Sequence, residues 1–167
     1  MQRINVQFYN ARGDNEGVMN RVVSYLDPPY CHCEVEFRDT LACAIYWGGT
    51  VHMKNRTFNA ANYDSIELKC PQHDYDRALL LARGKSADGE GFNLRHMLGS
   101  KIPVLRADVQ GTFCSKLCAE VLVAANLLPH DVCTAELTPS GLFQRLSAIH
   151  GTSTAQPEAI AALDFVA

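Results

Sequence analysis

The sequence predicts a single domain in which strands and helices are both present. At 167 residues, the chain has the length of one domain and can bury enough apolar surface to fold unaided. Short segments with alternating apolar and polar residues lie before residue 70, whereas the clearest helical spacing lies after residue 110. No internal repeat divides the chain. We therefore expect one domain over residues 1–150 and a loose, alanine-rich tail over residues 151–167.

Five segments have the pattern of strands. Apolar and polar residues alternate in the first of them, and three more follow in quick succession. Gly48 and Gly49 supply a tight turn, so the segments on either side of it are expected to form a hairpin. The expected strands span residues 4–9, 31–37, 41–47, 50–57 and 65–69.

Four segments are expected to form helices. Asp27-Pro28-Pro29 ends the first, because proline lacks the backbone N–H that a helix needs. The second is expected to turn Tyr75, Leu79 and Leu80 toward the core. Between the second and third helices we expect irregular, glycine-rich chain over residues 84–111, with one helical turn over 92–98. The expected helices span residues 15–26 (capped by Asp14), 74–83, 114–126 and 139–149.

The composition is that of an ordinary globular protein and excludes several classes of partner. The net charge is −3 and no run of Lys or Arg exceeds two residues, which argues against a nucleic-acid surface. The N-terminal residues lack the apolar core of a signal peptide, and no apolar stretch is long enough to span a bilayer. We therefore expect a cytoplasmic protein whose seven cysteines, an odd number, are reduced thiols.

Cys114 is the first candidate for chemistry, because it is expected at the start of a helix. Free N–H groups and a partial positive charge at that position favour a thiolate over a thiol, and they can also bind an oxyanion. The alternative is that Cys114 is a packing residue, since free cysteine is among the most buried residue types. Cys118, one turn later, is expected in the core.

His32 is the second candidate and is expected on a strand. Strand alternation places His32, Glu34 and Glu36 on one face. Such a row of ionisable groups indicates either a site or the solvent-facing side of an edge strand. In the first case His32 would act as the general base that takes the proton of Cys114 and returns it to the leaving group.

A third group should fix the orientation of the His32 ring. Glu34 is the nearest candidate in sequence, at about 6.6 Å along an ideal strand. His52 on a neighbouring strand is the alternative, and Asp39 and Thr40 are more distant possibilities.

A zinc site is a further possibility, because several zinc-competent residues occur in the first half of the chain. However, Cys31 and His32 point to opposite faces of a strand, and no second paired motif completes a set of four ligands. We therefore expect no metal and no cofactor. The zinc-competent residues are Cys31, His32, Cys33, Cys43, His52, Cys70 and His73.

The order of these landmarks resembles a known family. A strand with Tyr30-Cys31-His32-Cys33-Glu34 is followed by a glycine hairpin, and Phe113-Cys114-Ser115 later opens a long helix. Residues 4–147 look like the circularly permuted branch of the NlpC-type papain-like cysteine hydrolases, the YiiX-like group of bacteria and phages. In that branch the histidine strand precedes the cysteine helix.

The resemblance implies an α+β fold, in which a strongly curved antiparallel sheet packs against the Cys114 helix. It also implies Cys114 as nucleophile and His32 as base, and Glu34 matches the acidic position that follows the histidine. Family members often carry Tyr-Asp where this chain has Phe92-Asn93. If that tyrosine hydroxyl helps to bind the oxyanion in the family, the backbone N–H of Cys114 or another donor must serve here.

The sequence therefore predicts a cysteine-dependent hydrolase or acyltransferase that acts on an amide or thioester carbonyl through an acyl-enzyme. Peptidase, amidase, thioesterase and acyltransferase activities all remain open. The alternatives are a non-catalytic binding or structural module of the same fold and a small zinc-stapled interaction domain.

Overall fold

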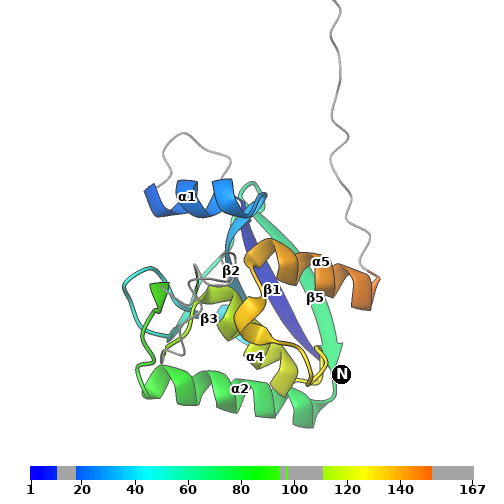
Figure 1. Ribbon diagram of the computed structural model, residues 1–167. Coiled ribbons are helices and arrows are strands. Elements are labelled where there is room, and N and C mark those ends of the chain that lie inside the picture. Colours follow the sequence, from blue (N-terminus) through cyan, green and yellow to red (C-terminus); the bar gives the residue numbers. More distant parts are fainter. Residues whose placement is uncertain (11–17, 95–96, 98–110, 152–167) are drawn as a thin grey trace, which may run out of the picture.

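The protein has an α+β architecture built on one antiparallel sheet (Figure 1). The computed structural model describes residues 1–10, 18–94, 97 and 111–151. Its five strands lie in the order β4-β3-β2-β1-β5. All five expected strands are confirmed, with β1 and β5 longer and β3 and β4 shorter than expected. The strands are β1 (Gln2–Asn10), β2 (Tyr30–Glu36), β3 (Leu41–Ala44), β4 (His52–Asn55) and β5 (Tyr63–Cys70).

β2 lies inside the sheet, so the edge-strand interpretation of its ionisable row is wrong. β1 pairs with β2 over nearly the whole length of that strand. On the other side, β3 pairs with β2 only at Val35 and Glu36. In the described part of the chain, the first half of β2 therefore lacks a strand partner on that side. A helix or loop can therefore approach the first half of β2 from the side that β3 leaves open.

Helices α4 (Cys114–Ala124) and α5 (Pro139–His150) lie across the sheet, and α2 (Gln72–Ala87) runs along one end of it (Figure 1). α4 packs on β2 and α2, and α5 packs on β2 and β5. α1 (Val18–Leu26) precedes β2, and the described residues also include the short 3-10 turns η1 (Arg38–Thr40) and η3 (Thr134–Glu136). Asp14 and the tail over residues 152–167 lie outside the described residues. None of the described helices is both long and apolar enough to cross a membrane.

Strand alternation divides the sheet into an apolar face and a polar face. Ile4, Val6 and Phe8 of β1 are fully buried in the same core as the inward residues of α4 and α5. On the opposite face, successive pairs of the β1–β2 register are Asn5 with Glu36, Gln7 with Glu34, and Tyr9 with His32. The polar row of β2 thus continues across β1.

Two expectations about α2 are wrong. Leu80 is 72% exposed, whereas Tyr75, Ala78 and Ala82 are buried. The buried residues recur at spacings of three and four, and Leu80 falls on the other side of the helix. The helix also begins at Gln72 and continues to Ala87, beyond the expected end at residue 83.

The helical turn expected over residues 92–98 is described only in part. Phe92 forms an isolated bridge with Thr112. The N–H of Met97 donates to the carbonyl of Asn93, which is the hydrogen bond of a helical turn. Residues 95, 96 and 98 lie outside the described residues.

The start of α5 is fastened to the segment that leads into β2. Thr138 caps the helix by accepting from the N–H of Gly141 at 3.1 Å. The N–H of Ser140 donates to Oδ2 of Asp27 at 2.9 Å, and its hydroxyl donates to the carbonyl of Asp27 at 2.9 Å. The N–H of Tyr30 donates to the same hydroxyl at 3.2 Å. The last helix therefore helps to hold the strand that carries His32.

Candidate active site

Cys114 is the first residue of α4. The backbone of Phe113, the residue before it, is extended, with φ −144° and ψ 169°. The change from this extended conformation to a helical one places the start of the helix at the cysteine. The first N–H groups of a helix have no partner within the helix, so they are available as donors at the start of α4. Cys114 is 5% exposed. Cys118, one turn later, is fully buried in the core, as expected.

The structure brings Cys114 and His32 together, although 82 positions separate them in the sequence. The two side chains lie close enough for each to shift the pKa of the other. His32 lies in the first half of β2, which has no partner in β3, and α4 packs on β2. His32 itself is 9% exposed, so the pair is almost completely removed from water.

The electrostatics of the pair favour a thiolate and an imidazolium. A hydrogen bond from the Cys33 thiol, together with the contact to His32, lowers the pKa of Cys114 well below its ordinary value, against the opposing effect of burial. Burial alone would lower the pKa of His32, but its contacts with Cys114 and Glu34 outweigh burial and raise that pKa to about 10. Each partner thus stabilises the charged form of the other.

Glu34 is the carboxylate nearest to the imidazole. Oε1 of Glu34 lies 3.4 Å from Nε2 of His32, within ion-pair range but without hydrogen-bond geometry. Glu34 is fully buried. The same oxygen accepts hydrogen bonds from Arg56 at 2.6 Å and from the hydroxyl of Tyr46 at 2.9 Å. The positive charge of Arg56 therefore compensates the buried negative charge of Glu34.

His52, the alternative third group, lies farther from the pair. The ring of Tyr46 is stacked on His32, with centroids 5.0 Å apart and planes at 24°. It is also stacked on His52, at 5.2 Å and 29°. Nδ1 of His52 lies 3.2 Å from the carbonyl of Thr50. Of the two candidates, the structure places Glu34, and not His52, beside the His32 nitrogen.

Sequence reasoning missed Tyr46 and Arg56. Both residues were expected inside strands, but they lie just beyond the ends of β3 and β4, and strand periodicity does not indicate their partner. Arg56 also donates to the hydroxyl of Tyr63 at 3.1 Å and contacts the hydroxyl of Tyr46. Its guanidinium lies over the ring of Phe58, 4.8 Å from the centroid. Arg56 is thus held on several sides in contact with Glu34.

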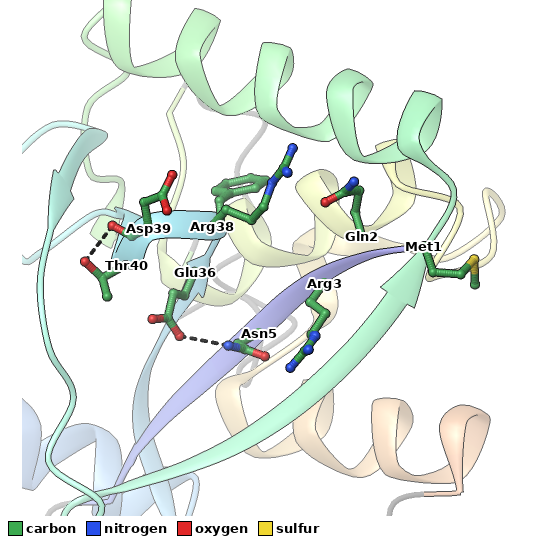
Figure 2. Close-up of a pocket in the computed structure, with 9 residues that line it drawn as sticks. Met1, Gln2, Arg3, Asn5, Glu36, Arg38, Asp39 and Thr40 are labelled. Carbon is green, nitrogen blue, oxygen red and sulfur yellow. Dashed lines mark hydrogen bonds between the residues drawn. The ribbon is translucent and has the colours of Figure 1, made fainter.

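Asp39 and Thr40, the more distant candidates, lie at a hollow of about 390 Å³ near the far end of β2 (Figure 2). Glu36, four residues after His32, lines this hollow and accepts a hydrogen bond from Asn5. No cysteine or histidine lines it. The hollow is therefore separate from the Cys114–His32 pair. Its other lining residues are Met1, Gln2, Arg3, Asn5, Phe37 and Arg38.

The zinc-competent residues do not come together. All seven cysteines are free thiols. In the described part of the chain, no group of three or more His, Cys, Asp and Glu side chains has an arrangement that could hold a metal ion. His73 is exposed and lies 3.3 Å from Asp74, its neighbour in sequence.

Phe92 lies beside the segment that leads to the nucleophile. It bridges to Thr112 in parallel orientation, and the N–H of Asn93 donates to the carbonyl of Thr112 at 2.8 Å. The ring of Phe92 packs on Trp47, with centroids 5.3 Å apart. This position therefore supplies an apolar ring and no hydroxyl.

Comparison of the chain with protein-family models, with curated proteins and with solved structures found no match in any of the three. The chemistry of the described site is therefore inferred from its geometry.

Proposed function

We propose that this protein is a cysteine-dependent hydrolase or acyltransferase that attacks an amide or thioester carbonyl through Cys114. The contact between a helix-start thiol and a strand-borne imidazole carries the proposal, because this arrangement creates a thiolate nucleophile. The order of the two elements, with the histidine strand before the cysteine helix, supports a circularly permuted papain-like fold. Peptides, amides and thioesters are the substrate classes that suit such a nucleophile.

The proposed reaction has two stages. In the first, the Cys114 thiolate forms a C–S bond to the carbonyl carbon, while the His32 imidazolium gives its proton to the departing amine or thiol. In the second, neutral His32 takes a proton from water or another acceptor, which attacks the acyl-enzyme and releases Cys114. Because Nε2 of His32 lies toward Glu34, the other ring nitrogen, Nδ1, is assigned to Cys114.

The oxyanion formed at each stage is assigned to the backbone. The free N–H groups of the first turn of α4, including that of Cys114, would donate to the charge that develops on the oxygen of the attacked carbonyl. Phe92 has no hydroxyl to contribute. We therefore propose that backbone donors alone stabilise this oxyanion in the described part of the site.

Selective alkylation tests the proposal with an internal control. Cys133 is an exposed free cysteine on the same chain. Iodoacetamide near pH 6 should modify Cys114 faster than Cys133, and the preference should vanish in His32→Ala. Site-resolved mass spectrometry measures both rates in one sample. Equal slow modification of both thiols would instead support the non-catalytic module.

Acyl probes of varied chain then define the reaction. Probes with amide and thioester leaving groups should label wild-type protein at Cys114 and leave Cys114→Ala unlabelled. One zinc ion per purified chain, together with absence of labelling, would instead support the zinc-stapled interaction domain.

A further inference from the structure

We infer that Arg56 is a positioning residue for the Cys114 nucleophile and that it acts through the buried carboxylate of Glu34. This inference rests on the proposed function. It extends the reactive pair to a row of four groups, Cys114, His32, Glu34 and Arg56, which we call the charged row. Sequence reasoning assigned no role to Arg56.

The geometry of the charged row is continuous. Cys114 contacts His32, Nε2 of His32 lies 3.4 Å from Oε1 of Glu34, and a guanidinium nitrogen of Arg56 lies 2.6 Å from that oxygen. The side chain of Glu34 is fully buried, and that of Arg56 is 23% exposed. The row therefore leads from the sulfur through the protein interior to a cation near the surface.

Charge balance explains why Arg56 should affect the sulfur. With a thiolate, an imidazolium, a carboxylate and a guanidinium, the charges alternate along the row and sum to zero. Removal of Arg56 leaves one net negative charge in a buried setting, which is costly unless a proton is taken up. Whether Glu34 or Cys114 takes up that proton, the thiolate is less favoured at acid pH.

The groups around the row do not obscure this effect. Burial, with Glu34 as a further cause, raises the pKa of Tyr63 on β5 and raises that of Cys43 on β3 to about 12. Burial also raises the pKa of Cys33, whose thiol lies beside those of Cys114 and Cys118. Tyr46 contributes its hydroxyl to Glu34. Changes in Cys114 reactivity between about pH 6 and 9 should thus reflect the charged row.

The test is a double-mutant cycle on the pH profile of Cys114 alkylation. In Arg56→Met, the midpoint of the alkylation profile should rise by about one pH unit. Arg56→Lys, which keeps the charge but loses the planar fork, should shift the midpoint less. In a Glu34→Gln background, Arg56→Met should shift the midpoint by less than about 0.3 pH units, because the two residues act together.

Arg38→Met is the matched control. The Arg38 guanidinium also lies over an aromatic ring, 5.3 Å from the centroid of Tyr75, but Arg38 follows the far end of β2. This variant should keep the wild-type profile. A wild-type profile in Arg56→Met, or equal effects of Arg56→Met in the wild-type and Glu34→Gln backgrounds, overturns the inference and leaves the proposed function standing. If Arg56→Met does not fold, the Arg56→Lys and Glu34→Gln/Arg56→Met proteins decide the same question. Loss of acid reactivity in the wild-type protein itself overturns both proposals.

Discussion

Tyr46 covers the ring of His32, with the two centroids 5.0 Å apart and the planes at 24°. Its hydroxyl at the same time donates to Glu34 at 2.9 Å. One side chain thus contacts two neighbouring members of the charged row. The flat contact limits rotation of the imidazole, and the hydroxyl limits movement of the carboxylate.

The two contacts of Tyr46 should be separable by mutation. Tyr46→Phe keeps the ring stack and removes the hydroxyl, so it should lower the free energy of unfolding by about 1–2 kcal/mol and retain most Cys114 reactivity. Tyr46→Ala removes both contacts and should lower Cys114 reactivity at pH 6 strongly. Urea denaturation and alkylation rates measure the two effects. Equal reactivity in both variants would show that the stack does not orient His32.

The stability of the protein should depend on pH through Cys114 and His32. Taken alone, the raised pKa of His32 adds stability that is fully present below 6.5 and is lost as the pH rises to about 10. Taken alone, the lowered pKa of Cys114 adds stability that is fully present above 9.0 and is lost as the pH falls through the lowered value. Between 6.5 and 9.0 these two slopes cancel, because folding then only moves a proton from sulfur to ring.

Urea denaturation of wild-type protein and Cys114→Ala checks this dependence. The difference between their free energies of unfolding should be flat between pH 6.5 and 9.0 and should shrink on both sides. A difference that rises or falls steadily through this window would contradict the ion pair.

Gly111 should be intolerant of a side chain. Its φ is +116°, and a Cβ would lie 2.9 Å from the carbonyl oxygen of Gly91 and 3.0 Å from Cβ of Asn93. Gly111→Ala should therefore cost about 1–3 kcal/mol and slow the alkylation of Cys114, three residues later. Gly89→Ala is the control, since φ is +63° but open space surrounds the new methyl group. Equal behaviour of the two variants would rule out the close approach.

Replacement of a leucine by alanine should affect stability differently on the buried and the exposed sides of the described helices. Leu122 on α4 is fully buried, and Leu122→Ala should cost about 2–5 kcal/mol through the cavity that it leaves. Leu80 on α2 is 72% exposed, and Leu80→Ala should change stability by less than about 0.5 kcal/mol. Thermal and urea unfolding measure both. A large loss of stability in Leu80→Ala would instead indicate that Leu80 faces the core, as the sequence predicted.

Ser140 should stabilise the entry to β2. Ser140→Ala removes the hydroxyl that donates to the carbonyl of Asp27 and accepts from the N–H of Tyr30, at a cost of about 1–3 kcal/mol. Ser65→Ala, at an exposed position on β5, is the control and should be nearly neutral. If Ser140→Ala is as stable as the control, the link does not hold the strand.

The sequence was most informative where periodicity decides the structure. Alternation along residues 31–37 correctly placed His32 and Glu34 on one face, because a strand has a period of two. The helix that begins at Cys114 followed from its apolar spacing. The same logic misplaced Leu80, since its helix carries apolar residues on more than one side.

The remainder of the site depends on contacts between distant segments. Glu34 and His52 could not be separated from sequence, because the choice depends on the ring of Tyr46 that lies between the two histidines. Arg56 follows the end of β4, and only tertiary packing brings it to Glu34. The open side of β2 also depends on where β3 stops, a boundary that strand propensity does not fix.

The hydrogen bonds between Asp27 and Ser140 span 113 positions, so they also order events during synthesis. The ribosome completes β2 before it makes the residue of α5 that fastens the beginning of this strand. A nascent chain that has emerged only as far as α4 already contains Cys114 and His32, but Ser140 does not yet hold the start of β2. Cys114 should therefore become fully reactive only after α5 has docked on Asp27, and products that stop before α5 should carry a less reactive thiol.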